Sequence, residues 1–117
     1  MSEYNPHNEF VKKQYEEALL HGKCRDPKTV HAVWNNINTF ERFTKYAGFE
    51  TFDADQAKVF KQWLEKQTNR HGELLSLSTI RSTLKNLREF FEWLAVHPKF
   101  LRKVDGRAIQ YLRLSNN

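Results

Sequence analysis

The sequence has 117 residues, a length that suits one domain able to bury a hydrophobic core without disulfides or metal ions. Hydrophobic residues make up 39% of the chain and aromatic residues 14%, which excludes a disordered chain, and the scarcity of glycine and proline argues against an all-β fold. The formal net charge of +5 favours polyanionic partners, and the single cysteine excludes an internal disulfide.

The first two predicted helices are amphipathic and have recognisable ends. One spans residues 6–21, where apolar side chains recur on a single face, and Gly22 is expected to stop it. The other begins at "RDPKTV", because Asp26 is a good N-cap and Pro27 suits the first helical position. The stretch "YAGF" is expected to end this second helix at Gly48.

The third and fourth predicted helices are also amphipathic and have recognisable ends. Asp53 and Gln56 in "FDADQ" resemble a capping box with Asp in place of Ser or Thr, and "NRHGE" closes that helix with a turn. The fourth helix is "LSLSTIRSTLKNLREFFEWL", for which Ser78 is the predicted N-cap and Pro98 the limit. Its apolar side chains recur at helical spacing and should face the core: Ile80, Leu84, Leu87, Phe91 and Leu94.

The C-terminal tail leaves two interpretations open. Val104, Ile109 and Leu112 could belong to a short helix after Asp105, or to an extended segment that docks on the helices. Apolar residues so close to the end also suggest that the natural chain continues beyond residue 117.

Nothing in the sequence indicates a membrane segment, a cofactor or a catalytic centre. No stretch approaches the ~20 apolar residues needed to cross a bilayer, and the N-terminus lacks a signal peptide's apolar region, so we expect a soluble, cytoplasmic protein without a membrane partner. His21 and Cys24 have ligand-like spacing, but no second pair completes a metal site, and we expect no cofactor. Neither a glycine-rich phosphate loop nor a nucleophile with its base is present.

The polar faces of the second and fourth predicted helices are rich in basic, amide and hydroxyl side chains. On the second helix they include Lys28, His31, Asn35, Asn38, Thr39 and Arg42, with no acidic residue among them. On the fourth they include Ser78, Arg81, Ser82, Lys85 and Asn86, and acidic residues come only later. Such faces suit DNA, because cations and hydroxyls meet phosphates, but any soluble helix needs a polar face. Charge pattern alone leaves both interpretations open.

Most of the chain resembles a known family. The motif "LSLSTIRSTLKNLREFFEWLAVHP", preceded by "TVHAVWNNINTFERFTKYAGFETF" and "DADQAKVFKQWLEKQ", is similar to the N-terminal core-binding (SAM-like) domain of tyrosine recombinases, the phage integrase family. The likeness covers about residues 6–100, and the fourth-helix motif is its most specific part. It implies an all-α fold, a four-to-five-helix orthogonal bundle that forms half of a clamp on double-stranded DNA.

In that family the second and fourth helices face the duplex. Carried over by position, the resemblance implies DNA-binding roles for residues of both helices: Lys28, Thr29, His31, Asn35, Arg42, Ser78, Thr79, Arg81, Ser82 and Lys85. It also implies partners, namely DNA, a C-terminal catalytic domain of the same parent protein and a recombinase oligomer on DNA, with the protein associated with the nucleoid.

The chain departs from the complete family pattern because the catalytic residues are missing. The family's chemistry needs two arginines, a lysine, a His-x-x-Arg pair and a tyrosine nucleophile, yet none of the five histidines is followed by arginine three residues later. Tyr111 lies in a predicted linker and has no such companions. We therefore expect no enzyme activity from this chain, with residues 1–100 as the DNA-binding domain and residues 101–117 as a tail or linker towards an absent catalytic domain.

An alternative hypothesis is a helical protein-interaction module whose basic charge is incidental. Its anchors would be Phe90, Trp93 and the apolar tail 109–112, because Phe90 and Trp93 fall off the centre of the fourth helix's apolar stripe. Trp34 and Trp63, by contrast, lie on apolar stripes and are expected in the core rather than at a binding surface.

Overall fold

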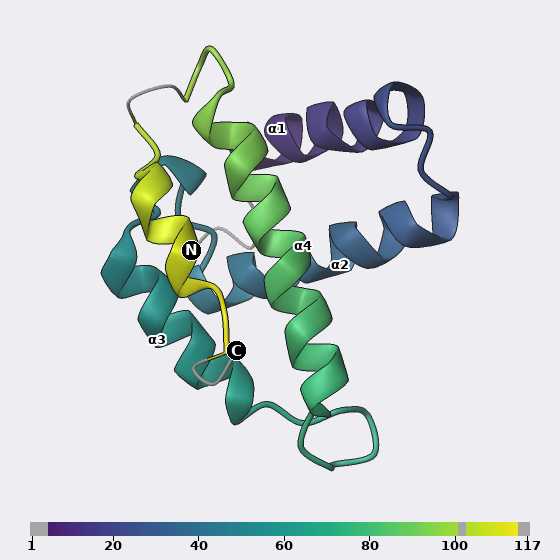
Figure 1. The fold of residues 1–117 in the computed structure, drawn as a ribbon, viewed down its shortest axis with the longest axis vertical. Helices are drawn as coiled ribbons and strands as arrows, with labels where there is room; N and C mark the ends of the chain where they lie inside the picture. Colours follow the sequence, from purple (N-terminus) through teal and green to yellow (C-terminus); the bar gives the residue numbers. More distant parts are fainter. Residues whose placement is uncertain (1–4, 101–102, 115–117) are drawn as a thin grey trace. The chain divides into compact units, whose positions relative to one another are not determined.

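The computed structural model describes residues 5–100 and 103–114. Within these ranges it contains four α-helices, one π-helical segment, two 3-10 segments and no strand beyond an isolated bridge between Thr68 and Leu74 (Figure 1). The predicted all-α fold class is confirmed. Two compact units, Met1–Phe49 and Glu50–Asn117, make up the chain and are described in turn.

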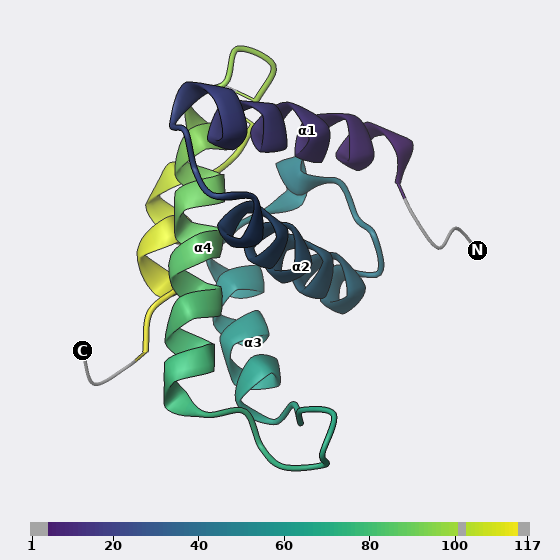
Figure 2. The same cartoon turned by 90° about the vertical axis from the view of Figure 1, so that its right-hand side faces the viewer.

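The first unit consists of two helices that pack together (Figure 2). Helix α1 (Pro6–Glu17) is capped by Asn5 and continues as the π-helical segment η1 (Ala18–Gly22), so the helical path ends at the predicted glycine. Helix α2 (Pro27–Thr44) begins as predicted, because the Asp26 carboxylate accepts a hydrogen bond from the Lys28 N–H at 2.7 Å.

The predicted end of α2 at Gly48 is wrong by four residues. The helix stops at Thr44 because Lys45 and Tyr46 adopt left-handed backbone conformations, with φ of 58° and 65°. The Tyr46 N–H then donates to the Glu41 carbonyl at 2.8 Å and satisfies one of the last free acceptors of the helix. Glycine adopts this conformation most readily, which is why the sequence pointed to Gly48.

A buried ion pair joins α1 to α2. Lys12 is 2% exposed and Glu41 is fully buried, and the Lys12 ammonium lies 2.5 Å from Glu41 Oε1 and 2.7 Å from Asn38 Oδ1. The Asn8 amide donates to the other Glu41 oxygen at 3.1 Å. Charges this deeply buried are tolerated only when paired and hydrogen-bonded, as these are. The network therefore links α1 to α2, and Glu41 lies inside this packing rather than on the solvent face of α2.

The second unit begins within the short 3-10 segment η2 (Phe49–Thr51). Helix α3 (Ala54–Glu65) is capped by Asp53, which accepts from the Gln56 N–H at 2.8 Å, so the predicted cap is confirmed. The other half of the predicted capping box is missing, because the Gln56 side chain donates to the Thr51 hydroxyl instead.

Helix α4 (Leu77–Ala95) begins two residues before the predicted position. Its N-cap is Ser76, not Ser78: Ser76 has an extended backbone, and its hydroxyl accepts from the Thr79 N–H at 3.1 Å. Ser78 consequently lies inside the first turn with an exposed side chain. Both serines stand ahead of the apolar stripe, and only the backbone path after the preceding turn distinguishes them.

The core of the second unit is built on the apolar face of α4. The predicted core residues of this helix are all buried, with exposed fractions of 4% or less, and Phe91 stacks on Phe52 with ring centroids 3.9 Å apart. The tail forms the short helix that the sequence left as one of two options: η3 (Gly106–Tyr111), a 3-10 helix capped by Asp105, which packs on α3 and α4. Its apolar neighbours Val104 and Leu112 are buried.

Candidate nucleic-acid interface

The predicted DNA-binding side chains of α2 are all exposed. They recur over four turns of the helix: Lys28, Thr29, His31, Asn35 and Arg42. The Arg42 guanidinium donates to the Thr39 hydroxyl at 3.2 Å, and that hydroxyl donates to the Asn35 carbonyl, so Arg42 lies along the helix surface. Because the Lys12 ion pair buries Glu41, no carboxylate of α2 itself offsets these basic groups.

Beside this face of α2 lies an open hollow of about 320 Å³. It is lined by side chains of α1, η1 and α2: Glu16, Leu20, Pro27, Val30, His31 and Trp34. Trp34 and Trp63 were expected in the core, but both are half-buried. Trp34 instead covers the buried ion pair, with the Lys12 ammonium 4.9 Å from its ring centroid.

The predicted side chains of α4 are also exposed, and they occupy the first half of the helix: Ser78, Thr79, Arg81, Ser82 and Lys85. Residues three or four apart lie on one helix face, so Ser78, Arg81 and Lys85 form a row. Thr79 has a structural role as well, because its hydroxyl accepts from the Ser76 hydroxyl at 3.0 Å. The acidic residues of α4, Glu89 and Glu92, come in its second half.

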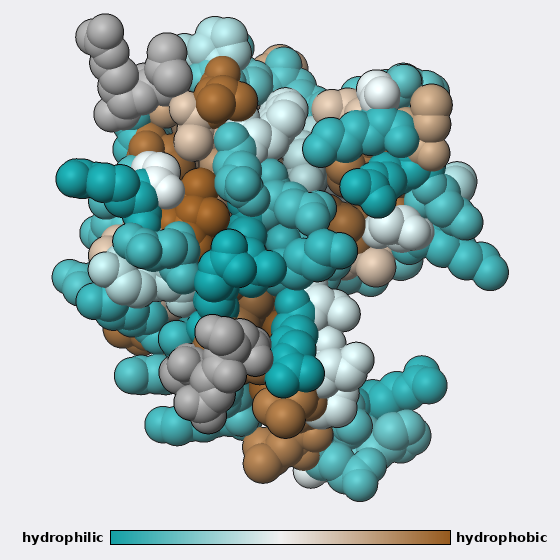
Figure 3. All heavy atoms as spheres, viewed as in Figure 1, coloured by the Kyte–Doolittle hydropathy of each residue, from teal (hydrophilic) through white to brown (hydrophobic). Residues whose placement is uncertain are grey.

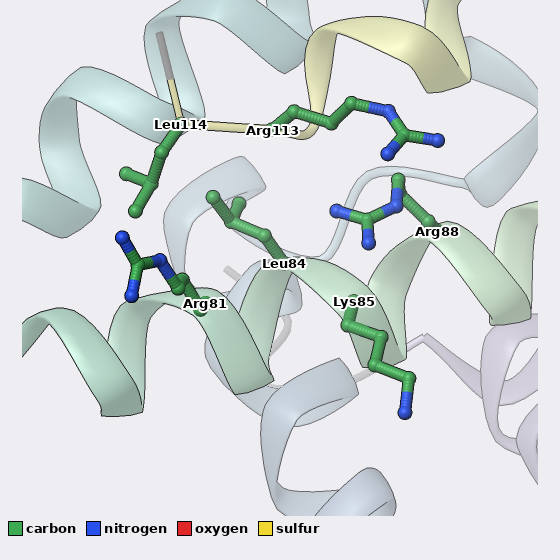
Figure 4. A pocket seen from close by; sticks show the side chains of 6 residues that line it. All are labelled: Arg81, Leu84, Lys85, Arg88, Arg113 and Leu114. Atoms are coloured by element: carbon green, nitrogen blue, oxygen red, sulfur yellow. The ribbon is translucent and has the colours of Figure 1, made fainter. Parts of the chain in front are cut away.

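Two arginines beside this row were not among the predicted residues. Arg88 and Arg113 line a hollow of about 230 Å³ between α4 and the C-terminal segment, together with Arg81, Leu84, Lys85 and Leu114 (Figure 4). Arg88 continues the spacing of Arg81 and Lys85 and could have been found from the sequence. Arg113 could not, because only the packing of η3 brings it to α4.

A hydrogen bond fixes the Arg88 side chain, and both burial and the charge of Arg113 disfavour its protonated form. Its Nη1 donates to the Leu112 carbonyl at 2.6 Å, across 24 residues of sequence. Burial, and then the charge of Arg113, lower the pKa of Arg88 from its usual value, while Glu92 and Glu89 act in the opposite direction. A guanidinium stays protonated in proteins, so the hollow carries at least two positive charges.

The surface around α4 carries both hydrophilic and hydrophobic side chains. Figure 3 shows hydrophilic side chains along much of α4 and a hydrophobic patch near its N-terminal end. Leu77, the first residue of α4, and Leu74 in the preceding loop are exposed at 62% and 66%. Of the anchors of the alternative interaction hypothesis, Phe90 and Leu112 are fully buried and Ile109 is 9% exposed, whereas Trp93 is half-buried and Tyr111 is 36% exposed.

The part of the chain that the structure describes has neither a metal-binding cluster nor a membrane-spanning helix. These residues contain no group of three or more His, Cys, Asp or Glu side chains placed to hold a metal ion. His21 lies 3.4 Å from the Glu17 carboxylate, and Cys24 is exposed. None of the described helices is both long and apolar enough to cross a membrane.

The fold and these surfaces define an all-helical domain with exposed, basic and hydroxyl-rich faces on α2 and α4. The family model of the phage integrase SAM-like domain matches residues 8–104. The chain therefore belongs to the phage integrase SAM-like domain family, as its sequence motifs predicted, and domains of this family are the non-catalytic N-terminal part of integrases. No curated protein and no solved structure matches the chain.

Proposed function

We propose that this chain is the DNA-binding module of a site-specific tyrosine recombinase of the phage integrase type. It grips duplex DNA at the recombination site through α2 and α4, while a separate C-terminal domain of the same parent protein cuts and exchanges strands, with several recombinase copies on the DNA. One observation carries the proposal: all ten side chains that the family resemblance selects are exposed. The burial of Glu41, the acidic residue of α2, supports it.

The side chains have chemically distinct tasks in this proposal. Lysine and arginine neutralise phosphates, and the hydroxyls of Ser78 and Ser82 donate hydrogen bonds to phosphate oxygens. The first turn of α4 adds unpaired backbone N–H groups and the positive end of the helix dipole, which favour an anion near Ser78. In a major groove the Arg81 guanidinium can also donate two hydrogen bonds to a guanine edge, and the Asn35 amide can donate one to an adenine edge and accept one from it.

Fluorescence anisotropy with a labelled duplex across a salt series tests the proposal. Because each neutralised phosphate releases condensed counterions, log affinity should fall by roughly 0.9 per unit of log salt for each phosphate contacted. The variant R81A/K85A removes two of the proposed contacts and should reduce that slope by roughly 1 to 2. Both side chains are exposed and neither has a salt-bridge partner within 4.0 Å among the described residues, so the melting temperature should not change.

A matched control separates local contacts from net charge. K103A/R107A removes two exposed basic residues from the same unit, and Arg107 is already offset by Asp105 at 3.7 Å. This control should retain the wild-type salt slope. Wild-type binding without a salt slope, or equal losses in R81A/K85A and K103A/R107A, would contradict the proposed interface.

A further inference from the structure

We propose that the hollow between α4 and the C-terminal segment is a phosphate-binding site, in which Arg88 and Arg113 together hold one phosphate group. The site itself follows from the geometry of the second unit. Only the source of the phosphate rests on the proposed function, which would supply a phosphodiester of the DNA backbone; the other source with the same chemistry is free phosphate. The proposal adds the C-terminal segment to the binding surface, which the sequence had confined to helix faces.

The arrangement of side chains points to an oxyanion. In Figure 4 the guanidinium groups of Arg88 and Arg113 face each other across one end of the hollow, and Arg81 extends towards Leu114 at the other end. Lys85 lies on the rim with its ammonium turned outwards. Leu84 lies between the arginines, and an apolar wall strengthens electrostatic attraction to a bound anion.

Among the described residues, no acidic side chain lies close enough to form an ion pair with either arginine. Neither Arg88 nor Arg113 has a carboxylate within 4.0 Å among the residues that the structure describes, and Glu89 and Glu92 act on Arg88 only at longer range. Two like charges held together in a partly desolvated place repel each other. An anion bound between them converts that repulsion into attraction, whereas a neutral ligand would not.

Arg88 is also preorganised to bind. The hydrogen bond from its Nη1 to the Leu112 carbonyl fixes the side chain and uses one of its five N–H donors, which leaves the others for a ligand. The same bond places the next residue, Arg113, at the hollow. A paired set of planar guanidinium donors matches phosphate oxygens well. The hollow, about 230 Å³, is smaller than the ~300–1,000 Å³ of pockets for drug-sized ligands, which suits a single group on a longer chain.

The first test uses inorganic phosphate and the whole chain labelled with nitrogen-15. The side-chain Nε–H signals of Arg88 and Arg113 should shift saturably as phosphate is added at constant ionic strength, with chloride as the balancing anion. R113A should lose the shift of Arg88. Arg113 is exposed and has no ion-pair partner among the described residues, so R113A should keep the wild-type circular dichroism spectrum and melting temperature.

The second test uses duplex DNA and compares R113A with R107A, which removes the same charge from an exposed position outside the hollow. R113A should bind DNA roughly tenfold more weakly than R107A and lose roughly 0.9 of the salt slope. That result supports the site with DNA as the source. Phosphate-dependent shifts at both arginines together with equal DNA binding by R113A and R107A support the site with free phosphate as the source.

Failure of this site and failure of the proposed function give different results. If the wild-type chain binds DNA with a steep salt slope, while R113A behaves as R107A does and phosphate moves neither arginine signal, the phosphate site is overturned and the DNA-binding function stands. If the wild-type chain does not bind DNA but phosphate shifts both arginine signals, the proposed function fails and the anion site stands.

Discussion

Replacing Lys12 with methionine tests the role of the buried ion pair in the first unit. Methionine keeps an unbranched apolar side chain of similar length but removes the ammonium that contacts Glu41 at 2.5 Å and Asn38 at 2.7 Å. Glu41, which is fully buried, then loses its counter-charge. K12M therefore leaves an unpaired carboxylate inside the packing of α1 on α2.

K12M should lower the free energy of unfolding by a large amount. Removing one partner of a buried pair typically costs ~3–5 kcal/mol, because the other charge stays buried without compensation. We expect the lower end, ~3 kcal/mol, since the Asn8 amide still donates to Glu41 at 3.1 Å. A change of that size is a substantial part of the ~5–15 kcal/mol by which domains are usually stable.

Urea denaturation followed by circular dichroism and tryptophan fluorescence measures the free energy of unfolding. Two variants serve as controls. K13M changes the exposed neighbouring lysine and should alter stability by no more than ~0.5 kcal/mol. K12M/E41Q removes both charges, and the side-chain amide oxygen that E41Q introduces can still accept from Asn8, so this double variant should regain most of the loss. If K12M unfolds at the same urea concentration as K13M, the ion pair does not stabilise the unit and the reasoning is refuted.

Two further predictions concern the start of α4 and the face of α2. S76A should lower the free energy of unfolding by ~1 kcal/mol because Ser76 caps the helix, whereas S78A should change it by less than ~0.5 kcal/mol. If urea denaturation shows a larger loss of stability for S78A than for S76A, Ser78 is the cap instead. K28A should reduce the salt slope of DNA binding by roughly 0.9, whereas K45A, at an exposed position just after α2, should leave it unchanged. If fluorescence anisotropy gives the same salt slope for K28A and K45A, Lys28 does not contact the DNA.

The features that the sequence predicted well are those set by local chemistry. Asp26 and Asp53 cap their helices because a carboxylate next to free backbone N–H groups needs no distant partner. The apolar stripe of α4 is buried because its spacing puts those residues on one face whatever lies opposite. The exposure of the predicted DNA-binding residues follows from the same periodicity.

The features that the sequence missed depend on residues far apart along the chain. Lys12 and Glu41 read as ordinary surface charges on their own helices, and only the packing of α1 on α2 shows that they are buried partners. The placement of Arg113 at α4 likewise follows from the docking of η3 and from the bond between Arg88 and the Leu112 carbonyl. The left-handed Lys45 was missed for a different reason, because glycine is preferred there but not required.

The burial of Glu41 links the core of the first unit to its surface. An exposed carboxylate next to Arg42 would offset the guanidinium and lower the attraction of this face for phosphate. Placing that carboxylate inside the unit costs desolvation, and the Lys12 ammonium and the Asn8 amide offset the cost. A lysine of α1 that never reaches the solvent face of α2 thus helps to keep that face free of acid. Stability and surface charge are therefore coupled in this unit, because the ion pair that compensates the buried Glu41 carboxylate also leaves the exposed face of α2 without acid.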